Sequence, residues 1–262
     1  MNYKIQKLDS FRLLSIYGYE AIGSGHNMHA LIELDITDIR QRLRLQRKAG
    51  HSVSFFGFIL FSIAKTIDEH KELNHIRRGK KLYYFDEIDI DIPIELELNG
   101  VLTPRKYIVK NAAKKTSIEI SQEIEQAKKS WKDNGNAGED DKWAQWWIKF
   151  SMICPKWLFK LIAKQFSRNP FLLKKGFGTT YVSSVGGFSN VSGFIVPFFA
   201  GQYRPLAFAI GNTTKKPGIV GSEIKIRDYL SMTVTINHDL VDGAPAARFI
   251  NRLKQRIEGN IE

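Results

Sequence analysis

The sequence predicts a layered α/β fold in which helices flank a mixed β-sheet. Segments that alternate with period two and segments with helical periodicity follow one another without a regular strand–helix–strand repeat. An antiparallel hairpin is predicted in the middle of the chain, and a helix at its C-terminal end. These two observations favour a sandwich-like layer over a regularly wound parallel sheet.

Composition permits a folded domain and suggests an anionic partner. With 262 residues, of which 43% are hydrophobic, the chain can bury a sizeable core as one large domain or two small ones, and we expect a single domain over 1–262. The net charge of +12 suggests a nucleic acid, a membrane surface or a phosphorylated small molecule. Cys154 is the only cysteine, which excludes an internal disulfide and a cysteine metal cluster.

The sequence also carries no targeting or membrane-spanning signal. No apolar run approaches the ~20 residues that a transmembrane helix needs. Residues 1–14, MNYKIQKLDSFRLL, lack the apolar core of a signal peptide. We therefore expect a cytoplasmic protein.

The first elements are a strand and two helices. Residues 27–36 have the mixed pattern of a strand, and Thr37 and Gly50 are the expected N-cap and C-cap of the helix that follows. Residues 54–73 form a second helix, which is apolar nearly all round at its start and is therefore expected at the centre of the fold. The first helix has only a narrow apolar stripe, made of Ile39, Leu43 and Leu45.

Strands are predicted at 77–85, 86–98 and 101–109, the last two joined by a turn at Asn99-Gly100. Residues 86–98, DEIDIDIPIELEL, alternate between charged and aliphatic residues, so one face of this strand is expected to be wet. Its acidic residues are better explained as solvated charges than as metal ligands; they are Asp89, Asp91, Glu95 and Glu97.

An amphipathic helix over 114–131, with Ser117 as its possible cap, leads into an unusual insertion at about 131–177. All five tryptophans lie between residues 131 and 157, and Pro155 divides the run into two short helices. Lysines recur at helical spacing, at Lys142, Lys149, Lys156, Lys160 and Lys164. A core or oligomer-interface role is favoured, with contact to a membrane surface or to nucleic acid as alternatives.

The C-terminal part returns to strands, at 179–188, 205–212 and 222–237, and then to a helix. His238 stands at the end of the last strand, with Asp242 and Gly243 before the helix. A lone histidine is usually an ordinary hydrogen-bonding residue, but this combination is more specific. The glycine would permit a tight reversal, and Asp242 could orient the backbone or a neighbouring base.

The segment NHDLVDGAPAARFINRL resembles the HxxxDG active-site segment of chloramphenicol acetyltransferase and of the catalytic domain in the acyltransferase component of 2-oxoacid dehydrogenase complexes. Four further segments are similar to that family in the same order: HALIELDITDIR, SFFGFILFSIAKTIDEHKELN, KKLYYFDEIDIDIPI and GTTYVSSVGGF. Each match is weak alone, but their order over residues 10–258 is specific.

The resemblance implies a chloramphenicol acetyltransferase-like fold, a homotrimer with active sites between subunits, and acyl-coenzyme A as substrate. The acceptor would carry a thiol, hydroxyl or amine, and no metal would be needed. His238 would act as general base, and Ser183 would stabilise the oxyanion, with Ser184 on the opposite strand face as the second choice. Asp242 would fix the active-site loop. Asn237 and Gly243 would line the substrate site.

Three features depart from the family pattern. Asp239 follows the histidine where the dehydrogenase enzymes commonly have arginine, and Asn237 precedes it where Asp or a second His is frequent. No Arg or Lys lies between Arg12 and Arg40, so the arginine that pairs with the family's aspartate would have to be Arg12 or Arg248. Lysines near plausible loops for the coenzyme phosphates are Lys174, Lys175, Lys215 and Lys216, although each also fits a solvated surface.

The sequence contains no lipoyl domain and no Ala/Pro-rich linker, so it resembles free-standing members of the superfamily. The acceptor could then be a lipoyl domain on a separate protein or a small molecule. Three hypotheses stay open: an acyl-coenzyme A-dependent acyltransferase, which is favoured, a binding or scaffold protein that retains the fold, and a chloramphenicol-type acetyltransferase.

Overall fold

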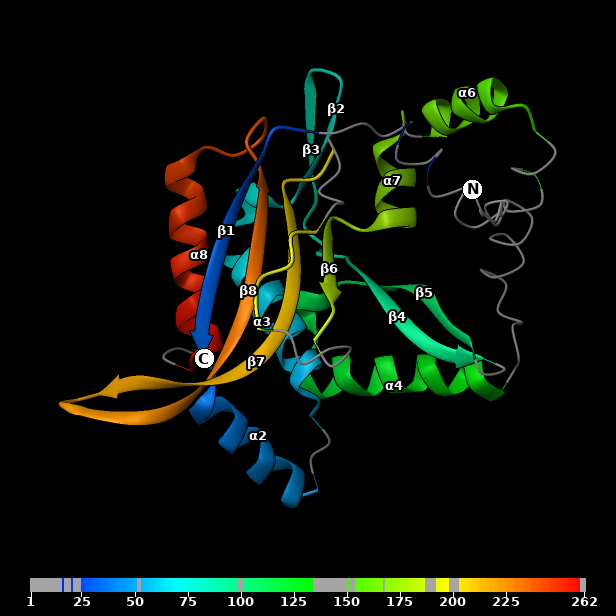
Figure 1. The fold of residues 1–262 in the computed structure, drawn as a ribbon. Coiled ribbons are helices and arrows are strands. Elements are labelled where there is room, and N and C mark those ends of the chain that lie inside the picture. Colours follow the sequence, from blue (N-terminus) through cyan, green and yellow to red (C-terminus); the bar gives the residue numbers. More distant parts are fainter. Residues whose placement is uncertain are drawn as a thin grey trace, which may run out of the picture.

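The computed structural model describes 25–50, 53–98, 101–133, 154–166, 168–186, 192–197 and 203–259, together with Ile16, Glu20 and Phe150. Six strands form one mixed sheet in the order β1-β8-β7-β6-β4-β5 (Figure 1). They are β1 (Asn27–Asp35), β4 (Ile90–Leu98), β5 (Val101–Val109), β6 (Thr180–Ser184), β7 (Leu206–Val220) and β8 (Glu223–Asn237). β6 is parallel to both of its neighbours, and the other pairs are antiparallel.

α3 (Phe55–Glu69), α4 (Ser117–Asp133) and α8 (Gly243–Ile257) pack against this sheet, which confirms the predicted layered α/β fold. The other helices are α2 (Thr37–Lys48), α6 (Lys156–Phe166) and α7 (Pro170–Phe177), with short 3-10 turns at Lys71–Leu73 and Ala112–Lys114. A separate hairpin pairs β2 (His75–Arg78) with β3 (Lys81–Tyr84). No helix in the described part of the chain is long and apolar enough to cross a membrane.

α3 is the central helix, as its all-round apolar sequence predicts. Ile59, Ile63 and Ile67 are fully buried in the core between the sheet and α8. Ser54 caps the helix, because its hydroxyl accepts the Gly57 N–H at 2.9 Å. A side chain at Gly57 would lie within 2.1 Å of the hydroxyl of Ser121 on α4, so glycine is needed where the two helices approach.

Two predicted helix caps are wrong by one residue. Thr37 is the first residue of α2 rather than its cap, and its N–H and hydroxyl both donate to Asp35. α4 is capped by Thr116 rather than by Ser117: Thr116 accepts the Glu119 N–H, and the Glu119 carboxylate accepts the Thr116 N–H in return. A hydroxyl that caps a helix lies just before the first helical residue, which periodicity alone cannot locate to one position.

Other boundary predictions have mixed outcomes. Gly50 adopts a φ of +89° just after α2, close to its predicted C-cap position, but Leu45 is 59% exposed and does not belong to the buried stripe. β4 and β5 pair with Leu98 opposite Val101, which confirms the predicted hairpin; its two turn residues lie outside the described chain. The tryptophan-rich segment that precedes Cys154 lies outside it as well, apart from 131–133 and Phe150.

The prediction that one face of residues 86–98 is exposed to solvent is wrong at the start of this strand. Asp89 and Asp91 are only 6% and 4% exposed, whereas Glu95 is exposed as predicted. Asp91 pairs with Lys106 at 3.5 Å and with the fully buried Arg204 at 3.6 Å. Lys106, Lys174 and Arg204 lie against this part of the strand and give the two buried carboxylates the cationic partners that they need.

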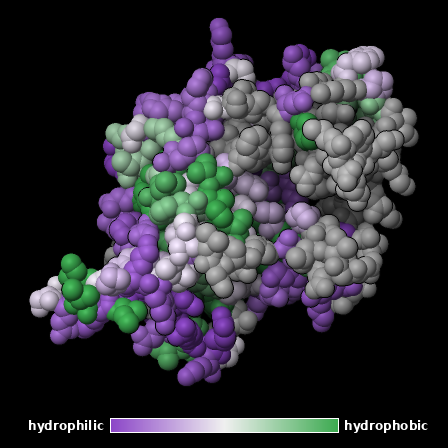
Figure 2. Space-filling view, in the orientation of Figure 1, coloured by the Kyte–Doolittle hydropathy of each residue, from purple (hydrophilic) through white to green (hydrophobic). Residues whose placement is uncertain are grey.

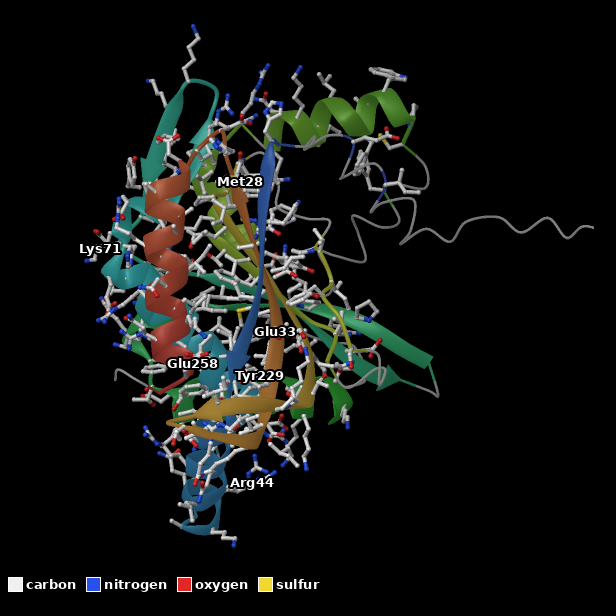
Figure 3. The ribbon with its side chains drawn as sticks, turned by 60° about the vertical axis from the view of Figure 1, so that its left-hand side comes forward. Met28, Glu33, Arg44, Lys71, Tyr229 and Glu258 are labelled. Atoms are coloured by element: carbon white, nitrogen blue, oxygen red, sulfur yellow. The ribbon has the colours of Figure 1, made fainter. Side chains whose placement is uncertain are left out.

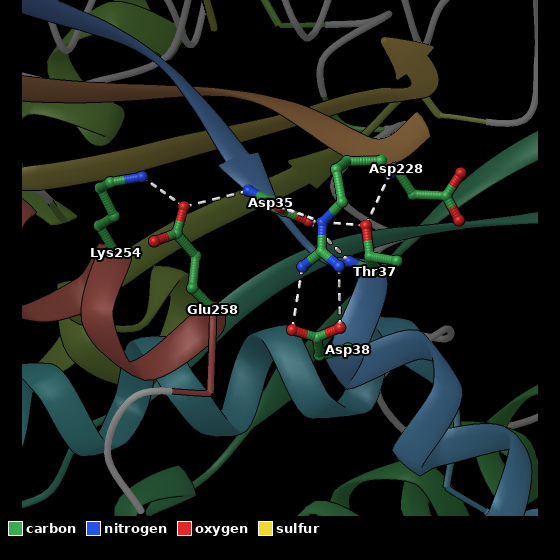
Figure 4. A network of polar contacts seen from close by, with 7 residues as sticks. Asp35, Thr37, Asp38, Asp228, Lys254 and Glu258 are labelled. Carbon is green, nitrogen blue, oxygen red and sulfur yellow. Dashed lines mark hydrogen bonds and ion pairs between the residues drawn. The ribbon is translucent and has the colours of Figure 1, made fainter. Parts of the chain in front are cut away.

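The strands β7 and β8 form a hairpin that extends well beyond the sheet, and β7 is longer than the predicted 205–212. A polar network fixes its root (Figure 4). Arg227 donates to Asp35 at 2.7 Å and to both oxygens of Asp38, and the Asp228 N–H donates to the Thr37 hydroxyl at 2.8 Å. Burial raises the pKa of Asp35, but the hydrogen bonds from Arg227 and Thr37 outweigh it and lower that pKa, so the carboxylate stays charged.

Candidate active site

The chain turns sharply where β8 ends, and Asn237 holds the turn. Its side-chain oxygen accepts the Asp239 N–H at 3.0 Å, and its backbone carbonyl accepts the N–H groups of Leu240 and Val241 at 3.0 Å. An asparagine that closes such a turn uses its short side chain in place of a backbone carbonyl. Asn237 is fully buried, so it fixes the turn within one protomer, and its predicted contact with substrate stays a prediction.

His238 follows with an exposed side chain on a fixed backbone. Its N–H donates to the carbonyl of His26 at 2.7 Å, which ties the turn to the residues before β1. The His238 ring is therefore accessible to solvent, while a hydrogen bond holds its main chain in place. That is the arrangement a general base needs before a substrate arrives.

Asp239 contacts two residues that are distant from it in the sequence, and no local pattern predicts either contact. Its carboxylate receives a hydrogen bond from the His26 ring at 2.8 Å and lies 3.7 Å from the Arg77 guanidinium on β2. The hydrogen bond from His26 lowers the pKa of Asp239; burial opposes this shift, and the positive charges of His26 and Arg77 add to it. The aspartate that departs from the family pattern therefore links three segments around His238.

Asp242 and Gly243 begin α8, but not in the predicted way. Gly243 does not adopt a positive φ, and a Cβ there would meet no atom within 4 Å, so the expected tight reversal does not require it. Asp242 occupies the N-cap position without a capping side-chain hydrogen bond. Within the described residues it forms no ion pair with Arg248, and Arg12 lies outside them. The space beside Gly243 is open to a substrate or to a second copy of the chain.

The two candidate serines point to opposite faces of β6, as the sequence predicts. Val182 is fully buried in the core, so Ser184 shares the core face and Ser183 lies on the other face. In the sheet register Ser183 is opposite Ala209, which is opposite the buried Thr233. Neither serine hydroxyl forms a hydrogen bond with another described residue, so both can donate one to a ligand.

Ser183 and His238 cannot meet within one protomer. The register separates Ser183 from Thr233 by two strand spacings, and His238 lies five residues further along. With about 4.8 Å per strand and 3.3 Å per residue, the two positions are roughly 19 Å apart. The sheet is too rigid to close such a gap, so these two groups can act together only if they come from different subunits.

Of the four lysines considered for coenzyme phosphates, two are already engaged. Lys174 lies 2.7 Å from Glu87 and 2.9 Å from Asp89, and Lys216 pairs with Glu33. The two others, Lys175 and Lys215, have exposed side chains.

Comparison with known proteins decides the family. Residues 27–142 and 177–262 match the model of the 2-oxoacid dehydrogenases acyltransferase (catalytic domain). The chain belongs to this acyltransferase family. Ser183, His238 and Asp242 all lie within the matched residues, and 143–176 lie outside them.

Relatives and solved structures agree with this assignment to the acyltransferase family. The dihydrolipoyllysine-residue acetyltransferase component of the pyruvate dehydrogenase complex of Rickettsia felis is 26% identical over 98% of this chain and 52% of its own length. This acyltransferase-family chain thus spans about half the length of the curated relatives it matches. A probable dihydrolipoamide acetyltransferase from Listeria monocytogenes has the same fold, with a TM-score of 0.69, 20% identity, and coverage of 98% of this chain and 94% of the other.

The dihydrolipoamide acetyltransferase of Azotobacter vinelandii also shares the fold of this acyltransferase-family chain, with a TM-score of 0.68, 14% identity, and coverage of 98% and 93%. In that protein a serine, a histidine and an asparagine have been examined for their roles in catalysis. Sequence reasoning found the histidine and serine candidates here, but it missed the contacts of Asp239, because partners distant in the chain leave no local pattern.

Proposed function

We propose that this chain moves an acyl group between coenzyme A and a thiol acceptor, with His238 as general base and the Ser183 hydroxyl as oxyanion donor. The observation that carries the proposal is the exposed His238 on a fixed turn, within the part of the chain that matches the acyltransferase family. The Rickettsia relative is named for a dihydrolipoyllysine residue, which supports a dihydrolipoyl thiol as acceptor. Such a group would be carried by a lipoyl domain, which for this chain could belong to a separate protein.

The reaction needs only these side chains. His238 takes the proton of the acceptor thiol as its sulfur attacks the thioester carbonyl of the acyl-coenzyme A. The Ser183 hydroxyl donates a hydrogen bond to the oxyanion of the tetrahedral intermediate. Collapse breaks the bond to the sulfur of coenzyme A, and the His238 imidazolium returns the proton to that leaving thiolate. No acyl-enzyme is required, because both substrates are held in one site.

The site would be completed by a neighbouring subunit in a homotrimer. The roughly 19 Å between Ser183 and His238 in one protomer supports this, because closed rotational symmetry brings each histidine to the serine of the next copy. The positive charge of the chain suits the diphosphate and 3′-phosphate of coenzyme A, and the exposed Lys175 and Lys215 are candidates to hold them.

The β7–β8 hairpin offers a surface for such a neighbour. Ile219 and Ile224 are opposite each other near its tip, and Ile226 shares their face; they are 81%, 78% and 76% exposed. Figure 2 shows the hydrophobic tip standing clear of the body. The other face carries Lys216 and Arg227, which pair with Glu33 and Asp35 of the same protomer. An apolar face left open on a fixed arm favours contact with another copy.

The test is acceptor-dependent release of free coenzyme A from acetyl-, propionyl- and succinyl-coenzyme A. Dihydrolipoamide, chloramphenicol, a small alcohol and a small amine serve as acceptors. We expect release with dihydrolipoamide that falls roughly 10²–10⁴-fold in His238→Ala and about 10²–10³-fold in Ser183→Ala. Ser184→Ala is the matched control on the opposite strand face, and its rate should stay close to that of the parent chain.

Other outcomes would overturn the proposal in distinct ways. Coenzyme A binding without release for any acceptor would indicate a binding or scaffold protein. Release with chloramphenicol alone would indicate an antibiotic acetyltransferase. A large loss in Ser184→Ala with an unchanged Ser183→Ala would transfer the oxyanion role to Ser184.

A further inference from the structure

Helix α6 is apolar on two faces, and only one of them is covered. Its inner face carries Phe159, Ile162 and Phe166, which are buried or half-buried. The Phe166 ring lies 3.5 Å from the place where Gly176 of α7 would carry a Cβ, so α6 packs on α7. The outer face carries Trp157 and Leu161, one turn apart and 69% and 58% exposed. A surface helix normally has polar residues at such positions.

Helix α7 also exposes apolar side chains, although it is firmly attached to the body. Leu173 is 1% exposed in a small core with Ile76 and Tyr203. Phe171 and Leu172, which precede Leu173 on the same helix, are 64% and 39% exposed. We call the α6–α7 surface the group formed by Trp157, Leu161, Phe171 and Leu172 with the exposed basic residues Lys164 and Arg168.

All charged residues of the segment 154–177, which contains both helices, are positive. Residues 154–177 contain six Lys or Arg and no Asp or Glu. Burial and then the positive charge of Arg168 lower the pKa of Arg78 on β2, so the positive potential extends from the helices onto the neighbouring hairpin. Lys174 is paired with Glu87 and Asp89, and the remaining cations of residues 154–177 lie in a segment without any acidic residue.

Nothing in the acyl-transfer site uses this surface. The family match stops at residue 142 and resumes at 177, so α6 and nearly all of α7 lie in a segment that the catalytic family does not share. α6 lies at the opposite end of the molecule from α2 in both ribbon views, and Figure 3 marks α2 by Arg44. The α6–α7 surface therefore needs an explanation of its own.

We propose that the α6–α7 surface binds the headgroup region of an anionic lipid bilayer. Trp157 would lie at the interface, Leu161, Phe171 and Leu172 would enter the acyl boundary, and the basic side chains would contact lipid phosphates. The chain would lie on the membrane and not cross it.

Charge and chemistry disfavour the other occupants. The exposed Trp157 contradicts a core role for this residue. A second copy docked through the same surface would bring like charges together without an acidic residue to compensate. Nucleic acid would match the charge, but such interfaces are polar, and the aliphatic Leu161 and Leu172 provide neither stacking nor hydrogen bonds.

The experiment is co-sedimentation of the full chain with vesicles of phosphatidylcholine, alone or with about one third phosphatidylglycerol. We expect binding only to the anionic vesicles. Leu161→Ser should weaken it roughly tenfold, and Lys164→Gln about fivefold. Leu45→Ser is the matched control: Leu45 is 59% exposed on the basic helix α2 and should not contribute.

Tryptophan quenching by brominated lipid locates the contact. Trp157→Phe keeps an apolar ring, so this variant should still bind anionic vesicles while losing part of the quenching. Circular dichroism and coenzyme A release of each variant should match the parent chain, because all substituted positions are exposed and none of them is proposed to contact a substrate.

Three results would overturn the inference. They are absence of binding to the anionic vesicles, binding that Leu161→Ser and Lys164→Gln leave unchanged, and binding lost in Leu45→Ser. Binding of an RNA or DNA oligonucleotide that Leu161→Ser abolishes, without binding to vesicles, would assign the surface to nucleic acid instead.

Discussion

Lys106 shows how one residue can be exposed along its length and buried at its charged end. Its side chain is 41% exposed, yet its ammonium lies 3.5 Å from Asp91 and 3.6 Å from the centre of the Phe177 ring. Burial lowers the pKa of Lys106 to about 8, although the charge of Asp91 opposes the shift. At neutral pH the ammonium of Lys106 is still charged, so part of the free-energy cost of removing it from water destabilises the folded chain.

This pKa leads to a prediction for stability against pH. Between about 8 and the ordinary 10.5, the unfolded chain binds more protons at Lys106 than the folded chain does, so this residue's contribution to stability rises with pH across that window. Relative to Lys106→Met, the parent chain should gain on the order of 1 kcal/mol, a value reduced for the exposed stem. Urea unfolding at pH 8 and pH 10 measures the gain. Lys110→Met, at an exposed lysine, is the control, and equal slopes for all three proteins would contradict the prediction.

The β7–β8 hairpin is the element on which the proposed trimer depends most. Arg227 and Lys216 attach its inner face to Asp35, Asp38 and Glu33, so the arm keeps its direction before any subunit binds. A fixed arm loses little conformational entropy on association, which strengthens a contact made by its apolar face.

We predict that Ile224→Ser combined with Ile226→Ser shifts the trimer toward monomer. Removing two isoleucines that are 78% and 76% exposed in one protomer takes apolar area out of the proposed interface without opening a cavity in the core. Sedimentation velocity measures the change. Lys225→Ser, between them on the opposite face, should leave the trimer intact, since its ion pair with Glu223 is at the surface. A trimer that survives the double substitution would place the interface elsewhere.

The whole molecule is incomplete as a catalyst if the site is shared, and this can be tested by mixing. Neither His238→Ala nor Ser183→Ala trimers contain a complete site. In a mixed trimer one of the three sites pairs an intact serine with an intact histidine, and random assembly makes three quarters of the trimers mixed. Coexpression in equal amounts should therefore restore about a quarter of the parent activity.

The control for the mixing experiment is the same two variants purified separately and combined without subunit exchange. No recovery on coexpression, from trimers shown by two tags to be mixed, would place both groups within one subunit and contradict the shared site.

Local pattern predicts the parts of the fold that local physics controls. The sequence places helix α3 over 54–73, and the helix lies at 55–69, because an all-round apolar helix can only be stable in a core. The end of β8 and the following helix are placed equally well. The HxxxDG resemblance leads to His238 as a candidate, and the separate resemblance of GTTYVSSVGGF leads to Ser183. The N-caps of α2 and α4, at Ile36 and Thr116, are each missed by one residue, because periodicity does not locate a helix boundary to one position.

Only the tertiary structure shows the features that depend on contacts between residues far apart in the sequence. The alternation of residues 86–98 indicates which side chains share a face, but not that Lys106 and Arg204 lie against Asp91. The sequence contains the cations that surround the α6–α7 surface, but only the packing of Phe166 on α7 shows that Trp157 and Leu161 face outward. Periodicity reports the direction of a side chain within its own element, whereas burial and pairing depend on which elements meet, and that information is spread over the whole chain.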